Sequence, residues 1–169
     1  VFTNDDKLAA KLKALRIHGG LERYQHQYIG LNGRCDSIQA AILSVKLAEF
    51  SSEIELREGI AQKYHTGLHN LDMVLPRIAD AFTSSWAQYS IQVKDRESFI
   101  AHLNAAKIPC AIHYPLAVHL QPCFNKYSFT QGDFPVAEAL SHKVVSLPFS
   151  PYLPGAQQDY IISVIQDYF

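Results

Sequence analysis

Two polar clusters in the sequence hold the residue types that could bind a ligand or act on one. The first lies in RYQHQYIGLNGRCDSIQAAIL, residues 23–43, where a guanidinium, two phenols, an imidazole and several amides precede a helix start. The Arg34 guanidinium is a planar fork suited to carboxylate or phosphate, and Asn32 adds amide donors. Glycines at 30 and 33 permit close approach of the backbone. A polar loop that only leads into the helix fits the same residues.

The second cluster is AIHYPLAVH, residues 111–119. A strand that ends in His113 and Tyr114 places an imidazole and a phenol at its C-terminal edge, where ligands often bind. A buried polar pair within a turn is the alternative. These two clusters indicate a piece of an α/β enzyme with an anion-handling loop.

Other motifs do not point to metal or nucleotide chemistry. His65 and His69 have helical spacing, but Thr66 stands where a zinc protease motif needs Glu, so exposed histidines are predicted. Cys110 and His113 are separated by an odd offset on a predicted strand, which directs them to opposite faces. The sequence has no G-x-S-x-G, Walker or G-x-G-x-x-G motif. We therefore expect no metal site.

The composition excludes several partner classes. In 169 residues, 48% are hydrophobic and 18% charged, which suits one domain, or one small domain plus part of another. A net charge of -1 gives no basic field for nucleic acid or anionic membrane. No apolar run approaches the roughly 20 residues that span a bilayer. Three cysteines without CxxC spacing predict reduced thiols and a cytoplasmic location.

Helical patterns dominate the first 70 residues. Asn4 is the predicted N-cap of a helix whose apolar stripe includes Leu8 and Leu12. Residues 21–35 keep no period and are predicted to form a loop. Asp36, with Gln39 three residues later, forms a capping-box pattern, which starts a helical stretch that continues to about residue 70. Serines and a glycine within it favour two helices or one bent helix.

The predicted secondary structure changes after Leu71, where short strands alternate with helices. Strands are predicted in MVLP, SSWAQYSIQV, IPCAIHY and VVSLP. Helices are predicted in DRESFIAHLNAAK, capped by Asp95, and over about 136–143 and 157–168. This alternation favours a small α/β or α+β layered domain.

Five ordered segments resemble the pyridoxal-phosphate-dependent nucleotide-sugar aminotransferases of the DegT/StrS family, of aspartate-aminotransferase-like fold type I. They are VFTNDDKLAAKLKALRIHG, RYQHQYIGLNGRCDSIQAAIL, EIELREGIAQKYHTGL, AIHYPLAVHLQP and VVSLPFSPYLP. The resemblance implies that residues 1–50 end the large cofactor-binding domain. Residues 51–70 would be the linking helix, and 71–169 the small C-terminal domain.

The resemblance also implies roles for individual residues. Asn32 would reach across a dimer interface to the cofactor phosphate of the neighbouring subunit, and Arg34 would lie near the substrate in that shared site. His113 and Tyr114 would contact the sugar nucleotide or the amino donor.

Two further residues, His26 and Tyr24, match polar substrate-binding positions in the loop that borders the active site. Gln25 stands where close relatives often carry a second histidine. The family's Schiff-base lysine would lie upstream of Val1, so no catalytic residue is expected in this chain.

The activity that the resemblance implies is transfer of an amino group from glutamate to a UDP-linked keto-sugar for surface polysaccharide synthesis of the O-antigen type. The complete protein would be a homodimer that uses pyridoxal 5'-phosphate. Two alternatives remain at this stage. One is a non-catalytic regulatory or binding member of the same fold, and the other is a free-standing association module.

Overall fold

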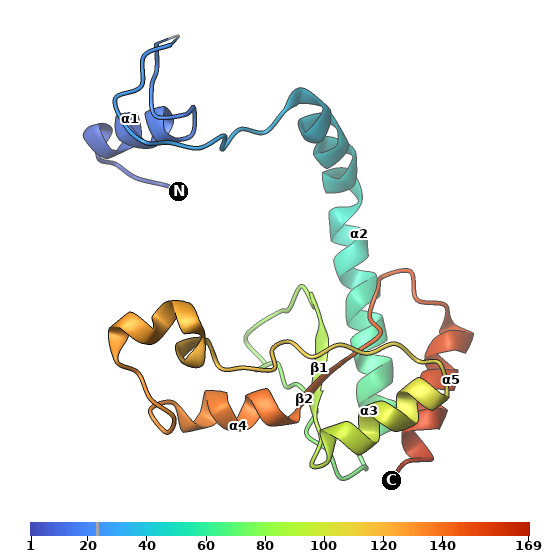
Figure 1. The fold of residues 1–169 in the computed structure, drawn as a ribbon. Helices are drawn as coiled ribbons and strands as arrows, with labels where there is room; N and C mark the ends of the chain where they lie inside the picture. Colours follow the sequence, from blue (N-terminus) through green and yellow to red (C-terminus); the bar gives the residue numbers. More distant parts are fainter. Residues whose placement is uncertain (23) are drawn as a thin grey trace. The chain divides into compact units, whose positions relative to one another are not determined.

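The computed structural model describes residues 1–22 and 24–169. Figure 1 shows helices joined to a small sheet, which confirms the predicted mixed α/β class. The chain divides into two compact units, Val1–Glu49 and Phe50–Phe169. Among the described residues, no helix has both the length and the apolar character needed to cross a bilayer.

The first unit contains helix α1 (Asp6–Leu15). Its N-cap is Asp5, whose carboxylate accepts hydrogen bonds from the backbone N–H groups of Lys7 and Leu8 at 2.8 and 3.1 Å. The predicted cap, Asn4, is therefore wrong by one residue, because either side chain can accept such a bond and the pattern alone does not choose between them. No strand forms at residues 1–2. Past the helix, Gly19 has a left-handed φ of 92°, which a glycine adopts without strain.

Helix α2 (Ser37–Leu68) is one continuous element of 32 residues, which excludes two separate helices and leaves the other predicted alternative, one bent helix. Its start follows the predicted capping box in part, because the Gln39 side chain accepts a hydrogen bond from the Asp36 N–H at 3.0 Å. Gly59 does not break the helix. Packing of the following turns against the rest of the second unit offsets the free-energy cost of placing a glycine inside a helix.

Strands β1 (Tyr89–Gln92) and β2 (Val144–Leu147) form a two-stranded antiparallel sheet in which Ser90 pairs with Ser146. The other two predicted strands, MVLP and IPCAIHY, are each reduced to a single bridge. Val74 bridges Gln92 on one edge, and Ala111 bridges Ser146 on the other. Pro76 and Pro109 lack the N–H that a longer ladder would need.

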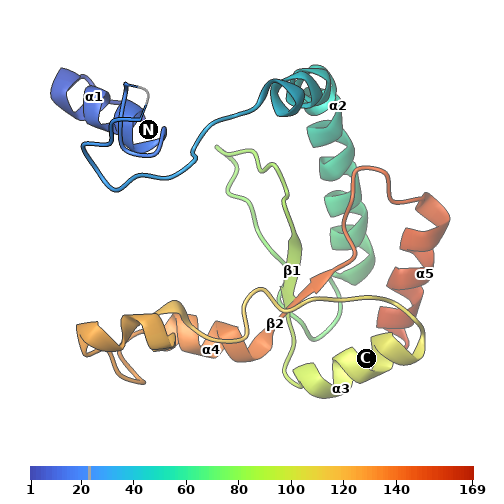
Figure 2. The same ribbon diagram turned by 45° about the horizontal axis from the view of Figure 1, so that its top comes forward.

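The second unit also holds helices α3 (Arg96–Ala105), α4 (Pro135–Lys143) and α5 (Gly155–Gln166), with the short 3-10 helices η1 (Val118–Leu120) and η2 (Pro122–Tyr127). Asp95 caps α3 as predicted, accepting from the Ser98 N–H at 3.0 Å. Figure 2 shows α3 and α5 near the C-terminal end of α2, whereas α4 extends from β2. The three helices confirm the predictions for these segments within two residues.

The hydrophobic core lies between the later turns of α2, the sheet, α3 and α5. Its fully buried side chains are Tyr64, Leu68, Tyr89, Ile91, Phe99, Leu103, Val145 and Ile165. Polar bonds join α5 to α2, and two of them come from glutamine side chains of α5. The Gln158 amide donates to the Ile60 carbonyl at 2.8 Å, and the Gln166 amide donates to the Gly67 carbonyl at 2.9 Å.

Candidate functional site

The loop that carries Asn32 and Arg34 is held against the end of α1 by backbone hydrogen bonds. The N–H of Gly33 donates to the Arg16 carbonyl at 2.9 Å, and Asn32 forms a bridge with Ile17. The Arg34 Nε donates to the Asn32 Oδ1 at 2.9 Å, and both side chains are exposed. This bond leaves the Asn32 NH2 group and the two terminal nitrogens of the guanidinium for an anion.

The close approach expected at Gly30 is to this chain itself. A Cβ at that position would lie 2.2 Å from the Gly19 nitrogen and 2.5 Å from the Leu15 carbonyl oxygen. Only glycine lets the loop pass so near to the end of α1. The glycine therefore positions the Asn32–Arg34 pair and does not itself contact a ligand.

Tyr24 and His26 lie on the same loop, and both side chains are exposed. Tyr24 has a left-handed φ of 65°. Arg23, the guanidinium at the start of the polar segment, lies outside the described residues. Within unit one, the bond between Asn32 and Arg34 joins two predicted site residues directly.

In the second unit, the sheet positions His113. Its Nδ1 lies 2.9 Å from the Oγ of Ser146 on β2, and that Oγ lies 2.8 Å from the Oγ of Ser90 on β1. Tyr114 packs edge-on against the His113 ring, with centroids 5.6 Å apart, and its phenol is exposed. The rings of His113 and Tyr114 are thus in contact, and they follow a single bridge at Ala111 in place of the predicted strand.

A pocket of about 290 Å³ opens beside His113. Its walls are mostly apolar, and the residues among them with polar or ionisable side chains are Gln88, Cys110, His113 and Ser146. Burial raises the pKa of the Cys110 thiol, so this sulfur is less reactive than a free cysteine. A mainly apolar cavity with a few convergent polar groups is the usual form of a small-molecule site.

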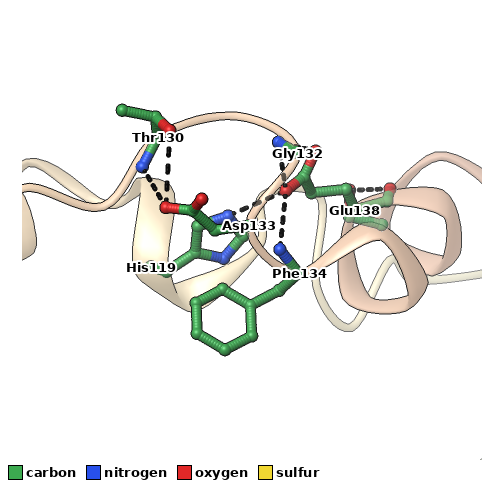
Figure 3. A network of polar contacts seen from close by, with 7 residues as sticks. His119, Thr130, Gly132, Asp133, Phe134 and Glu138 are labelled. Atoms are coloured by element: carbon green, nitrogen blue, oxygen red, sulfur yellow. Dashed lines mark hydrogen bonds and ion pairs between the residues drawn. The ribbon is translucent and has the colours of Figure 1, made fainter.

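The connection that follows Tyr114 is fastened to α4 by one carboxylate. Figure 3 shows Glu138 accepting from the backbone N–H groups of Gly132 and Phe134, at 2.9 and 3.3 Å, and contacting the His119 ring at 3.0 Å. Burial opposes ionisation of this carboxyl, but the two N–H groups and the imidazole together lower its pKa. Asp133 likewise binds the Thr130 N–H at 2.7 Å.

Among the described residues, no group of three or more His, Cys, Asp or Glu side chains could hold a metal ion. His65 and His69 are exposed, as predicted, and their rings stack with centroids 6.4 Å apart. The Nδ1 of His69 lies 2.9 Å from the Thr66 carbonyl oxygen.

Sequence reasoning missed the two serines behind His113 and the Glu138 anchor. One signal was available for Ser146, because it is a polar residue inside the otherwise apolar run VVSLP. A buried hydroxyl in such a run requires a hydrogen-bond partner. No local pattern pairs Glu138 with His119, since the two are 19 residues apart.

A family model described as the DegT/DnrJ/EryC1/StrS aminotransferase family matches residues 1–166. This chain belongs to that family. The DegT family assignment agrees with the resemblance inferred from the ordered sequence blocks.

Relatives within the DegT family are similar over the whole chain. The UDP-2-acetamido-2-deoxy-3-oxo-D-glucuronate aminotransferase of Pseudomonas aeruginosa is 38% identical over 165 residues, which cover 98% of this chain and 45% of that protein. A crystal structure of a DegT DnrJ EryC1 StrS aminotransferase from Brucella abortus has a TM-score of 0.86 and 42% identity, covering 99% of this chain and 45% of its own.

A structure of NtdA from Bacillus subtilis with bound cofactor PMP has a TM-score of 0.82 and 25% identity, covering 98% of this chain and 40% of its own. The chain therefore spans less than half the length of the relatives it matches.

Proposed function

We propose that this chain is the C-terminal portion of a pyridoxal-phosphate-dependent aminotransferase that moves an amino group from glutamate to a UDP-linked keto-sugar. The family match over residues 1–166 carries this proposal. The similarity to an aminotransferase named for a UDP-linked 3-oxo sugar supports the substrate class. A role in surface polysaccharide synthesis is inferred from the family resemblance, and a cytoplasmic location from the cysteine pattern of the sequence.

The domain boundaries that we propose for this chain are those that the family resemblance implies. Residues 1–50 would complete the large cofactor-binding domain, residues 51–70 would form the linking helix, and residues 71–169 would form the small domain. The Schiff-base lysine would lie upstream of Val1, so the segment alone would not turn over substrate.

The donor set of the polar loop fits a phosphorylated cofactor. The Asn32 amide and the Arg34 guanidinium are exposed, adjacent and rich in N–H donors, which suits an anion. When bound, pyridoxal phosphate supplies the electron sink for transamination. We assign Asn32 to the cofactor phosphate of a neighbouring subunit and Arg34 to the substrate in the same shared site.

The second set of contacts would come from the small domain. His113 would present its Nε2 to the sugar nucleotide or the amino donor, and the exposed phenol of Tyr114 would donate or accept beside it. His26 and Tyr24 would border the substrate. These side chains would bind and orient the two substrates, and the imidazole could also hold a proton.

A homodimer fits the exposed apolar side of α2. Ile38, Ile42 and Val45 are 75%, 57% and 72% exposed. Large apolar side chains at this spacing on one helix favour burial against another protein surface. A second copy of the chain would place its own Asn32 and Arg34 in a shared site.

The first test is to add pyridoxal phosphate to the purified chain, reduce with borohydride and map adducts by mass spectrometry. We expect no site-specific adduct, because Lys7, Lys11 and Lys13 lie on α1 outside any Schiff-base context. A single stoichiometric adduct would contradict our placement of the catalytic lysine.

The second test uses the complete protein. We expect formation of 2-oxoglutarate from glutamate only when a UDP-linked keto-sugar is present. We further expect His113→Ala to raise KM for that sugar. A complete protein that binds the cofactor but shows no turnover would instead support the non-catalytic alternative, which the aminotransferase relatives do not favour.

A further inference from the structure

The hydroxyl of Ser146 lies behind the His113 ring, where it can set the orientation of that ring. Ser146 is only 4% exposed, yet it occupies the middle of a strand whose neighbours, Val145 and Leu147, belong to the core. A buried hydroxyl without partners loses the hydrogen bonds that it would make with water. Ser146 avoids this loss through two contacts, one to His113 and one to Ser90.

The backbone geometry explains why these contacts form. Both backbone groups of Ser146 bond to Ala111, with its N–H donating at 2.8 Å and its carbonyl accepting at 3.1 Å. Ser146 and its register partner Ser90 are therefore a non-hydrogen-bonded pair, the kind in which cross-strand side chains lie closest. This pairing brings the two hydroxyl oxygens within 2.8 Å of each other.

The same register directs His113 towards Ser146. Ala111 lies directly opposite Ser146, so their side chains share one face of the sheet. His113 follows two residues later and returns to that face. Its Nδ1 then meets the Ser146 hydroxyl, while the ring also lines the 290 Å³ pocket.

We propose that Ser146, supported by Ser90, is a positioning residue that holds His113 by its Nδ1 and so presents Nε2 to the ligand. The assignment of a ligand to Nε2 rests on the proposed function. Each serine hydroxyl can donate one hydrogen and accept others. The Ser90–Ser146 pair can therefore accept a hydrogen from Nδ1 or, with both hydroxyls reversed, donate one to it. The ring orientation is kept in either state.

The Ser90–Ser146 pair makes the contact of His113 different from those of three other histidines, whose rings contact carbonyl or carboxylate oxygens. The rings of His69 and His102 each meet a backbone carbonyl, and the ring of His119 meets a carboxylate. Those partners only accept, so they require N–H at the contacting nitrogen. His113 instead contacts a hydroxyl that can either donate or accept, so the contact persists whichever ring nitrogen carries the hydrogen.

The test is nitrogen NMR of the chain labelled with 15N-histidine, in alkaline solution where imidazoles are neutral. His113→Gln identifies the His113 signals among the eight histidines. For the wild type we expect the Nδ1 shift to be displaced from that of a free imidazole by the hydrogen bond to Ser146, whichever partner donates. In Ser146→Ala this displacement should be lost, and Ser146→Thr should restore it. Ser90→Ala should give a smaller change in the same direction.

Backbone amide shifts of the sheet check that each variant is folded, and Ser146→Thr supplies a second readout if the alanine variant fails to fold. Unchanged His113 shifts in a folded Ser146→Ala chain would overturn the proposal. So would a threonine variant that behaves like alanine. No substrate is present in this experiment, so its outcome is separate from that of the aminotransferase assay.

Discussion

The two buried tyrosines of the core provide a matched pair for a stability prediction. Tyr64 donates its phenolic hydrogen to the Pro148 carbonyl at 2.8 Å. The hydroxyl of Tyr89 is also buried, but it has no hydrogen-bond partner among the described residues. Their rings lie close together, with centroids 5.1 Å apart, so the two side chains share one environment.

We predict that Tyr64→Phe and Tyr89→Phe change stability in opposite directions. Tyr64→Phe removes a hydrogen bond and should lower the free energy of unfolding by about 1 kcal/mol. Tyr89→Phe removes a desolvated hydroxyl that gains nothing from protein partners, so it should raise the free energy of unfolding by about 1 kcal/mol. The difference of about 2 kcal/mol is well within the resolution of urea unfolding.

The assay is urea unfolding followed by far-UV circular dichroism, with the fluorescence of Trp86 as a second probe. Trp86 is the single tryptophan and is buried, with its ring 5.7 Å from that of Tyr89. Ile91→Val is a control, since it trims the same strand without touching either hydroxyl. Equal losses of stability in the two phenylalanine variants would refute the reasoning.

The same pair makes a pH prediction. Burial raises the pKa of Tyr89 to about 12 and raises that of Tyr64 as well, with the neighbouring Tyr89 adding to the effect. The folded state therefore holds these protons more tightly than the unfolded chain does. The stability that this tighter binding contributes is fully present below about pH 10 and is lost as the pH rises towards 12. Tyr89→Phe should unfold at higher pH than the wild type, as alkaline titration followed by circular dichroism would show.

Three further predictions concern the anchors of the loops. Glu138→Gln should lower the protection factors of the amides of residues 118–134, that is, the intrinsic exchange rate divided by the observed rate at the same pH. Acid should lower these protection factors in the wild type as well, because the lowered carboxyl pKa stabilises the anchor only above its titration range. Exchange in the variant that matched the wild type would count against the anchor. Asp5→Ala should cost about 1 kcal/mol and Asn4→Ala much less, as urea unfolding of the helical signal would show, because Asp5 is the N-cap; equal effects would contradict this cap. Gly30→Ala should displace the loop, and unchanged amide shifts would contradict the close approach seen in the structure.

Much of the second unit was predictable because its signals are local. Asp95 and the apolar stripe after it fix α3, and Pro135 fits the first position of α4. The segments MVLP and IPCAIHY were predicted as strands and form single bridges. Their length depends on neighbours at the sheet edges, which no local pattern describes.

In the candidate site too, local features were predictable from the sequence and contacts between distant segments were not. The order of His113 and Tyr114 at the end of an extended segment pointed to a ligand position, and the structure places a pocket beside His113. The contact from Ser146 was beyond reach, because it depends on the cross-strand register between Ala111 and Ser146. Likewise, the single helix α2 depends on packing of its later turns, which outweighs the helix-breaking tendency of Gly59.

The bonds between α5 and α2 constrain the side chains of the two helices differently. Gln158 and Gln166 both donate to backbone carbonyls of α2, and a carbonyl is present whatever side chain its residue carries. These two bonds therefore depend on side chains of α5 alone, whereas the Lys63 side chain of α2 binds the Gly155 carbonyl and the Asp159 carboxylate of α5. Exposed side chains of α2 other than Lys63 can be replaced without altering these bonds, so that helix can acquire new surface chemistry. A designer who wished to remodel α2 should keep Lys63 and the two glutamines.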